Sequence, residues 1–378
     1  MKIIIDATYS PNGGALTQLI NMVEEFNSIK GIELIIYSKE SNKEILNKFN
    51  NKIIISRFAG ISIITRIFWC QFILPLHLLN SKDSVLFCPG NFSPIFSPTK
   101  TVVWIGTIGP FFKDFYDGFP LFDKLKLYVN RFLMIASSKS ADAVIFESYF
   151  TKRMFVNQYD FLEEKGHVIN IGLDDYFTSG NATPSDQKLK NLVNDGDFIL
   201  CVSHLYPYKN IIKLLQSFRD VLDLYDHSIN LVIAGSMDYK SYNSRIVKYI
   251  DKLGLNDNVI LLGRVDKEGL KFLYYNCDLL VFPSQYENFA YTLVEAMSCG
   301  TPIVSSNTTA MPESCQDAAV YFDPLDRVDI TNKILLVLNN EALKESLSQK
   351  SILRVNELPS FGEATNMTYN IMKNLIKQ

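Results

Sequence analysis

Short apolar runs rich in isoleucine, valine and leucine alternate with amphipathic stretches along almost the whole chain. The runs are continuous and bounded by polar or glycine-containing segments, which is typical of strands buried on both faces of a parallel sheet. Seven such runs lie in the first half, at 2–6, 33–38, 52–56, 84–88, 101–106, 142–148 and 167–172. Six lie in the second half, at 197–203, 230–235, 258–263, 278–284, 302–306 and 318–322. The pattern predicts two doubly wound α/β domains with right-handed crossovers.

A polar segment rich in Ser, Asn, Asp and Gly separates the two groups of strands. We expect a first domain over 1–175, a linker over 176–196 and a second domain over 197–360. The length of 378 residues agrees with two domains, because single cores stop growing at about 250–300 residues. The last stretch, 361–378, is predicted to be a helix that returns to the N-terminal domain. Its packed side is expected to carry Phe361, Met367, Ile371 and Ile376.

The composition narrows the class of protein. A net charge of −3 gives no support for a general nucleic-acid binder. The six cysteines lack zinc spacing and fall mostly in apolar runs, which indicates reduced, buried thiols in a cytoplasmic protein. The four histidines are too dispersed to propose a ligand set. The single D-x-D, at 195–197, precedes a strand and is interpreted as turn chemistry, so no metal site is expected.

One long apolar segment, 61–79, raises the question of a membrane. Arg66, Gln71 and Pro75 interrupt it, and a central arginine costs a few kcal/mol on insertion, which disfavours a transmembrane helix. A helix packed in the core and a helix with one face on the membrane surface remain as alternatives. We hypothesise that this segment, with Arg57 and Arg66, touches anionic lipid at the inner membrane, which would make the protein peripheral.

Two glutamates, Glu287 and Glu295, lie eight positions apart around an apolar run in the second half. If the whole segment were helical, they would differ by about 800° and about 12 Å, so a shared metal site or close acid/base pair is not expected. If instead Glu287 lies in a loop and Asn288 starts the helix, free helix amides lie between the carboxylates. This arrangement suits a long ligand with hydroxyls at both ends and an anion in the middle.

A lysine, Lys209, follows another predicted strand and precedes a helix that starts near Asn210. A cation at this place is suited to a phosphate, although a solvated lysine before a helix is the more ordinary interpretation of the residue alone. Both Lys209 and the glutamate segment follow strands of one predicted parallel sheet. The two sites are therefore expected at the same edge.

These residues resemble the retaining glycosyltransferases of family 4, which have the GT-B fold of two facing Rossmann-like domains. The glutamates in "PSQYENFAYTLVEAMSCGTPIVSSN" match that family's signature, and "VSHLYPYKN" resembles its lysine-bearing phosphate loop. In the first half, "RIFWCQFILP" and "VLFCPGNFSP" resemble the acceptor domain of polysaccharide-assembling members. The likeness covers nearly the whole chain and is strongest over 197–324.

The resemblance implies a role for each matching residue. Glu287 would lie near the donor sugar, and Lys209 would neutralise the departing diphosphate; these are the implied catalytic residues. The implied donor-binding residues are Glu295, His204, Asn288, Phe289, Ala290, Tyr291, Thr292, Arg264 and Val265. In the first domain, the implied acceptor or phosphate loop comprises Gly13, Gly14 and Thr107.

Two positions depart from the family's pattern. His204 stands where an arginine is common; a neutral imidazole would weaken phosphate neutralisation, whereas a protonated one would restore it. Gly106 and Thr107 stand where many relatives have a histidine or asparagine. The chain therefore lacks a histidine base in this loop, which front-face attack assisted by the departing phosphate would tolerate.

The function implied by the resemblance is a retaining, metal-independent glycosyltransferase without a cofactor. It would move a sugar from a nucleotide donor to an oligosaccharide, lipid-linked in surface polysaccharide assembly, on the cytoplasmic side of the membrane. Two alternatives stay open: a nucleotide-sugar epimerase of the same architecture, and an inactive nucleotide-sugar-binding partner of another transferase.

Overall fold

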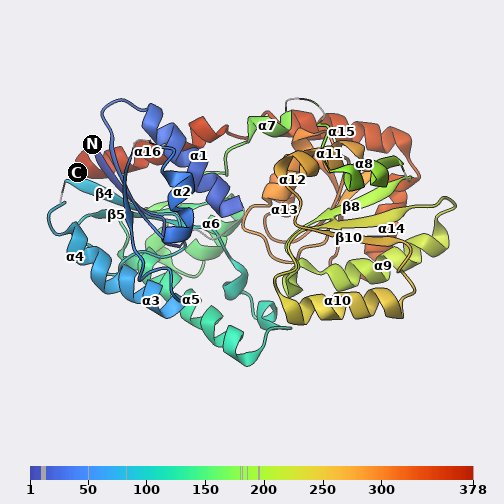
Figure 1. Cartoon of the computed structure of the whole chain (residues 1–378), viewed down its shortest axis with the longest axis horizontal. Coiled ribbons are helices and arrows are strands. Elements are labelled where there is room, and N and C mark those ends of the chain that lie inside the picture. The colour runs from blue at the N-terminus through green and yellow to red at the C-terminus, as the bar shows by residue number, and fades with distance from the viewer. Residues whose placement is uncertain are drawn as a thin grey trace. The chain divides into compact units, whose positions relative to one another are not determined.

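The computed structural model describes residues 1–9, 14–49, 51–81, 83–178, 180, 182–184, 186–194 and 196–377. The chain divides into two compact units (Figure 1). The first comprises Met1–Tyr116, Pro120–Gly172 and Pro359–Gln378, and the second comprises Asp117–Phe119 and Leu173–Leu358. The segment expected as a linker, 176–196, thus belongs to the second unit, where its described residues include most of α7 (Asp175–Thr178) and all of α8 (Gln187–Asn194).

The first unit contains one parallel sheet in the order β3-β2-β1-β4-β5-β6-β7. Its strands are β1 (Lys2–Asp6), β2 (Glu33–Ser38), β3 (Lys52–Ile55), β4 (Ser84–Cys88), β5 (Lys100–Ile105), β6 (Ala143–Phe146) and β7 (Gly166–Val168). Each corresponds to an apolar run of the sequence. Because the strands are buried on both faces, their apolar positions do not alternate with polar ones.

Helices cover both faces of this sheet (Figure 1). The helices on one face are α1 (Gly14–Ser28), α2 (Lys43–Leu46) and α16 (Phe361–Lys377). Those on the other are α3 (Ile63–Phe68), α4 (Leu74–Leu78), α5 (Leu121–Ser140) and α6 (Tyr149–Val156). The chain therefore returns at its C-terminal end to the first unit, where α16 packs on α1.

The packed side of α16 differs from the expected one. Its buried residues are Ala364, Thr365, Thr368 and Met372. Two of the residues expected on that side, Met367 and Ile376, are 45% and 38% exposed. A third expected residue, Ile371, does pack against the core of the first unit, next to the fully buried Met372.

The segment 61–79 is a helix with one buried face. It forms α3, a π-helical turn at Trp69–Ile73 and α4. Pro75, which has no amide hydrogen to donate, is the second residue of α4, so the wide turn ends two residues before it. Arg66 turns inward, with its guanidinium 4.1 Å from the ring centroid of Tyr9, so the expectation that Arg66 faces lipid is wrong. None of the described helices is both long and apolar enough to span a bilayer.

The second unit contains a parallel sheet in the order β10-β9-β8-β11-β12-β13. Its strands are β8 (Phe198–Val202), β9 (Asn230–Ala234), β10 (Val259–Gly263), β11 (Leu279–Phe282), β12 (Ile303–Ser306) and β13 (Ala319–Phe322). The order reverses between β8 and β11, which places the topological switch point, where ligands of such sheets bind, at the carboxyl ends of these two strands.

Helices also flank the second sheet (Figure 1). One core contains apolar residues of α9 (Ile211–Leu224), α10 (Lys240–Lys252) and α14 (Arg327–Leu338). The remaining helices are α11 (Lys267–Asn276), α12 (Tyr291–Ser298), α13 (Met311–Cys315) and α15 (Glu341–Val355). All six cysteines of the chain are buried and free, as the sequence predicted.

Candidate functional site

The predicted chemistry gathers at the carboxyl edge of the second sheet. β8 and β11 are hydrogen-bonded neighbours, with Leu279 opposite Ile199. The loop after β8 carries Lys209, and the loop after β11 carries Glu287. The amide of Gln285 donates to the carbonyl of Tyr208 at 2.9 Å, so the two loops contact each other directly.

Lys209 and Glu287 form an ion pair. The Lys209 Nζ lies 2.5 Å from Glu287 Oε1, and each side chain is only 13% exposed. Burial lowers the pKa of Lys209, but Glu287 together with Tyr208 and Cys201 outweighs burial, and the net pKa is raised. Lys209 therefore stays cationic at neutral pH. Its ammonium also lies 5.2 Å from the ring centroid of Tyr208 and 5.6 Å from that of Phe282.

The loop that carries Glu287 is braced by the segment after β12. The Glu287 amide donates to Thr309 Oγ1 at 3.1 Å, and Thr309 adopts a φ of +50°, which is uncommon for a β-branched residue. The Thr308 hydroxyl donates to the carbonyl of Gln285 at 2.9 Å, and the Ser306 hydroxyl donates to that of Ser284 at 2.5 Å. These bonds fix the backbone of the loop and thereby restrict the position of the Glu287 carboxylate.

The helix between the two glutamates begins later than expected. α12 starts at Tyr291 with Ala290 as its N-cap, whereas the sequence was interpreted with a start at Asn288. Asn288, Phe289 and Ala290 instead form a buried turn. The Leu293 amide already donates to the carbonyl of Ala290 at 2.9 Å.

Two amides at this helix start stay available for a ligand. Those of Ala290 and Thr292 have no partner in the part of the chain that the structure describes. They are suited to an anion, because unpaired amides and the positive end of the helix dipole coincide there.

Glu295 lies in the second turn of α12 and is bound to a neighbouring helix. The Tyr274 hydroxyl of α11 donates to Glu295 Oε2 at 2.9 Å. Burial raises the pKa of Glu295 to about 7, with a further rise from Asp174, and the Tyr274 hydrogen bond and Lys267 offset only part of it. Lys267 itself pairs with Asp174. Glu295 is therefore poised between its neutral and charged forms near physiological pH.

A buried hydroxyl lies one helical turn before Glu295. The Tyr291 Oη has no hydrogen-bond partner among the described residues. Burial, the Glu295 carboxylate and Asp174 all raise the pKa of Tyr291, so this hydroxyl remains a donor at every physiological pH. A buried polar atom without a partner is unusual in proteins, and a bound ligand is one way to satisfy it.

His204 lies in the β8 loop and Arg264 in the loop after β10. The Nδ1 of His204 and the Ser236 hydroxyl are 2.5 Å apart. Burial and the charges of Lys209 and Arg264 lower the pKa of His204. Because the free protein thus holds a neutral imidazole, the second cation of this edge is Arg264, which is exposed. Val265 follows it and is half-buried.

The backbone just after β9, at Gly235, lies close to the backbone just after β8, at Ser203. The φ of Gly235 is +152°, and a Cβ built there would lie 1.8 Å from the carbonyl oxygen of Ser203. Only glycine fits this place, directly before Ser236 and next to the loop of His204.

The three residues expected to contact an acceptor belong to the first unit. Gly14 begins α1 and Thr107 is half-buried after β5, while Gly13 lies outside the described residues. The amide of Gly106 donates to Asn91 Oδ1 at 2.7 Å, and Asn91 has a φ of +71°. The loop that lacks the family's histidine is thus fastened to the loop after β4.

No group of three or more His, Cys, Asp or Glu side chains able to hold a metal occurs among the described residues. Asp195 of the D-x-D lies outside them, and Asp197 is exposed just before β8.

Sequence reasoning missed Tyr274, Thr309 and Ser236. Each acts through a contact that spans at least 21 positions of the chain. Thr309 carried no signal at all. Tyr274 lies in the block "VILLGRVDKEGLKFLYYNCDLLVFPS", which resembles the family. The helix expected in this block carries two adjacent tyrosines, and its periodicity would have placed one of them on the buried side.

Comparisons with known proteins match the part of the chain that carries these site residues. Residues 183–354 match the model of the family "Glycosyl transferases group 1". The O-antigen chain mannosyltransferase B of Escherichia coli is 31% identical over 177 residues, which are 47% of this chain and 45% of that protein. The chain thus spans about half the length of the curated relatives it matches.

Two solved structures share the whole architecture. Sucrose-phosphate synthase from Thermosynechococcus elongatus superimposes with a TM-score of 0.78 at 16% identity, over 100% of this chain and 99% of that one. Anabaena Alr3699/HepE, in complex with UDP and glucose, gives a TM-score of 0.75 at 17% identity, over 99% of this chain and 100% of that one.

The two parallel-sheet units with this strand order define a GT-B protein. The part of the chain that matches the family model, residues 183–354, includes Lys209, Glu287 and Glu295.

Proposed function

We propose that the protein is a glycosyltransferase that takes a sugar from a nucleoside diphosphate donor bound at the carboxyl edge of the second sheet. The observation that carries the proposal is the Lys209–Glu287 pair beside the start of α12, with Glu295 at the far end of the same segment. The names of its relatives, among them O-antigen chain mannosyltransferases, support the same reaction class.

In this proposal the diphosphate competes with Glu287 for Lys209. The ammonium stays charged in the free protein and is held at the sheet edge by an anion that a phosphate oxygen can replace. The amides of Ala290 and Thr292 and the guanidinium of Arg264 add donors for the same group. Since negative charge grows on the diphosphate as the glycosidic bond breaks, these donors stabilise the transition state more than the ground state.

Glu287, once released from Lys209, accepts hydrogen bonds from hydroxyls of the donor sugar. Its loop is fixed by Thr309 and Thr308, so the carboxylate need not reorganise. Glu295, oriented by Tyr274, accepts from the ribose hydroxyls, and the unpartnered Tyr291 hydroxyl is available to the nucleoside part of the ligand.

The finer parts of the proposal concern stereochemistry, metal and acceptor. The sugar is transferred with retention, by front-face attack assisted by the departing phosphate, and without a metal ion because Lys209 and the helix amides supply the positive charge. The acceptor is an oligosaccharide, lipid-linked in surface polysaccharide assembly. The O-antigen relatives support this setting, and the complex of Anabaena Alr3699/HepE with UDP and glucose supports a nucleotide sugar as donor.

An acceptor-dependent transfer assay tests the proposal. The nucleotide is first identified by the rise in melting temperature that UDP, GDP, dTDP or ADP gives the protein. The protein is then incubated with nucleotide sugars of that base and with lipid-linked oligosaccharide. We expect anomer-retaining transfer that persists in EDTA. Binding of the donor without any transfer would favour an inactive nucleotide-sugar-binding partner, release of an altered free sugar without acceptor would favour an epimerase, and loss of activity in EDTA with rescue by Mn²⁺ would contradict metal independence.

A further inference from the structure

The outer face of the helical segment 61–79 is apolar and exposed. Its buried face consists of Trp69, Cys70, Leu74 and Leu78, which pack in the core of the first unit. Its opposite face is formed by Ile61, Ile64, Phe68, Phe72, Leu76 and Leu79, with exposed fractions between 47% and 75%. The spacing of three and four residues puts these six side chains in one stripe along the helix.

A second apolar stripe lies on the first half of α5. It comprises Leu121, Phe122, Leu125, Tyr128, Val129 and Phe132, with exposed fractions between 41% and 84%. The buried residues of α5 lie in its C-terminal half and are Leu133, Met134, Ser137 and Ser138. Like the first stripe, this one is the solvent side of a helix whose other side is already packed.

Both stripes lie on the same side of the first sheet, because α3, α4 and α5 share one core. The loop between them is tied to both helical segments. The side-chain amide of Gln71 donates to the carbonyl of Ser93 at 3.0 Å, and the amide of Ser93 donates to the Ser137 hydroxyl of α5 at 3.0 Å. From this loop Phe96 projects into solvent, 84% exposed.

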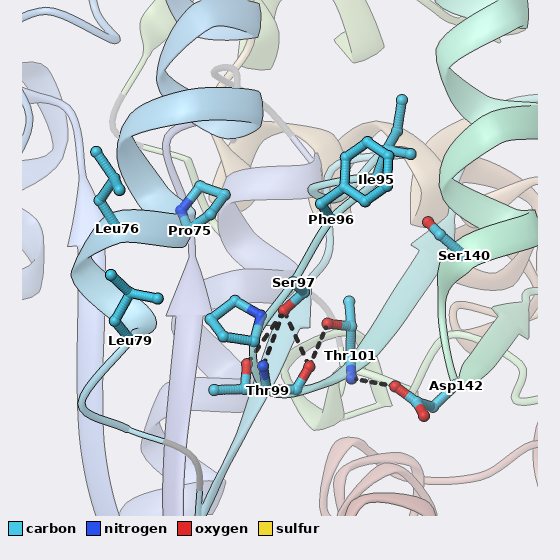
Figure 2. Close-up of a pocket in the computed structure, with 11 residues that line it drawn as sticks. Pro75, Leu76, Leu79, Ile95, Phe96, Ser97, Thr99, Thr101, Ser140 and Asp142 are labelled. Carbon is cyan, nitrogen blue, oxygen red and sulfur yellow. Dashed lines mark hydrogen bonds between the residues drawn. The ribbon is translucent and has the colours of Figure 1, made fainter.

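A pocket of about 430 Å³ opens between α4 and this loop (Figure 2). Leu76, Leu79 and Phe96 are among the residues that line it. Elsewhere in the lining the amide of Thr101 donates to Asp142 at 2.8 Å, and Lys100 pairs with the same carboxylate. Since these polar groups are already bonded within the protein, the part of the lining left for an occupant is apolar.

The charge around these stripes has the opposite sign to that of the chain. Residues 57–79 contain no acidic residue and, besides the inward-turned Arg66, one arginine, Arg57. Residues 121–140 contain four basic residues and one acidic residue, Asp123, which pairs with Lys126, while the whole chain carries −3. Lys124 lies one helical turn from Leu121 and Tyr128, and Lys126 one turn from Phe122 and Val129, so both lysines flank the second stripe.

We propose that these two stripes and Phe96 form a docking face that lies on an anionic lipid bilayer. Exposed apolar surface of this extent, bordered by basic side chains, is the pattern of interfacial membrane binding. A second copy of the chain fits less well, because a two-fold dimer would place the same basic face against itself. The proposal concerns only the first unit's surface and does not depend on the proposed function.

Vesicle co-sedimentation of the full chain tests the docking face. The protein should bind vesicles that contain phosphatidylglycerol more tightly than vesicles of phosphatidylcholine alone, and added salt should weaken binding. The triple variant Phe72→Ser/Phe96→Ser/Leu125→Ser should bind at least about tenfold more weakly to both, since each side chain loses its burial in the bilayer. Lys124→Gln/Lys126→Gln should lose about fivefold or more on the anionic vesicles only.

The matched control is Leu325→Ser/Leu353→Ser in the second unit, where both residues are 67% exposed. It should bind vesicles as the wild type does, and all variants should keep the same nucleotide-induced thermal shift. Equal binding by the triple variant and the control would overturn the proposal. So would the absence of vesicle binding together with a dimer, seen by light scattering, that Phe96→Ser dissociates, because the occupant would then be a second copy.

Discussion

The Lys209 ammonium lies 2.5 Å from the Glu287 carboxylate, although 78 positions separate the two residues in the chain. β8 and β11 are adjacent at the point where the strand order reverses, and this adjacency brings their loops together. A largely buried pair is costly to maintain, because desolvation of both charges offsets most of their attraction. We infer that the pair is kept because a ligand uses both members.

Variants of this pair should lose turnover and stability together. Lys209→Ala should lower kcat by roughly 100-fold or more, since it removes a cation that acts as the diphosphate departs. Glu287→Ala should also lower kcat. Each single variant leaves one buried charge unpaired, so the double variant should be more stable than the sum of the single effects predicts, by about 1–3 kcal/mol.

The control for this cycle is Lys344→Ala. Lys344 is also 13% exposed and pairs with Asp278, in the same unit. Its loss should lower the free energy of unfolding but leave kcat unchanged. If Lys209→Ala and Lys344→Ala have the same effect on turnover, Lys209 is merely structural.

Donor affinity should rise with pH because of Glu295. Its pKa is about 7, and the charged form is the better acceptor for ribose hydroxyls. From about pH 6 to about pH 8 the dissociation constant of the nucleotide sugar, measured by calorimetry, should fall about tenfold. Glu295→Gln should abolish this dependence, and Tyr274→Phe should shift its midpoint to higher pH. A wild-type constant independent of pH would contradict the role of Glu295.

Glu295 should also make the free energy of unfolding depend on pH. Between about pH 4.5 and 7 the folded protein holds a proton on Glu295 that the unfolded chain has lost. The contribution of Glu295 to the free energy of unfolding therefore falls as pH rises through this window. In denaturant titrations Glu295→Gln should flatten that fall.

Arg264, not His204, should be the second cation for the diphosphate. Burial, Lys209 and Arg264 lower the pKa of His204, so the imidazole is neutral at pH 8. Arg264→Ala should weaken binding of the free nucleoside diphosphate about tenfold or more at pH 8, and His204→Ala less than about threefold. His204→Arg should strengthen it. An equal loss for the two alanine variants would show that His204 is charged in the complex.

The approach of β9 to the β8 loop should depend on Gly235. Gly235→Ala places a Cβ against the carbonyl of Ser203 at a φ of +152° and should lower the free energy of unfolding by more than about 1 kcal/mol. Gly254→Ala is the matched control, since Gly254 has a φ of +65° and nothing within 4 Å of the added atom. A similar cost for both would mean that only the backbone angle matters.

The sequence predicted the fold better than the site. Each apolar run became a strand, because a strand buried on both faces needs continuous apolar residues. The carboxyl edge could be predicted for the same reason, since parallel strands end together. The start of α12 could not, because the loop before it is held at Glu287 by Thr309, which lies 22 positions away. Tyr274 and Thr309 were missed because their partners are distant in sequence.

Nucleotide-induced stabilisation tests the central claim most directly, namely that Lys209 and Glu295 clamp opposite ends of one nucleotide sugar. Nucleoside diphosphate at 100 times its dissociation constant should add about 2.7 kcal/mol to the free energy of unfolding of the wild type, and more than the monophosphate at equal concentration. Glu295→Ala and Lys209→Ala, at that same concentration, should each lose most of this gain. If both variants keep the full stabilisation, the donor binds elsewhere and the assignment of this edge is wrong.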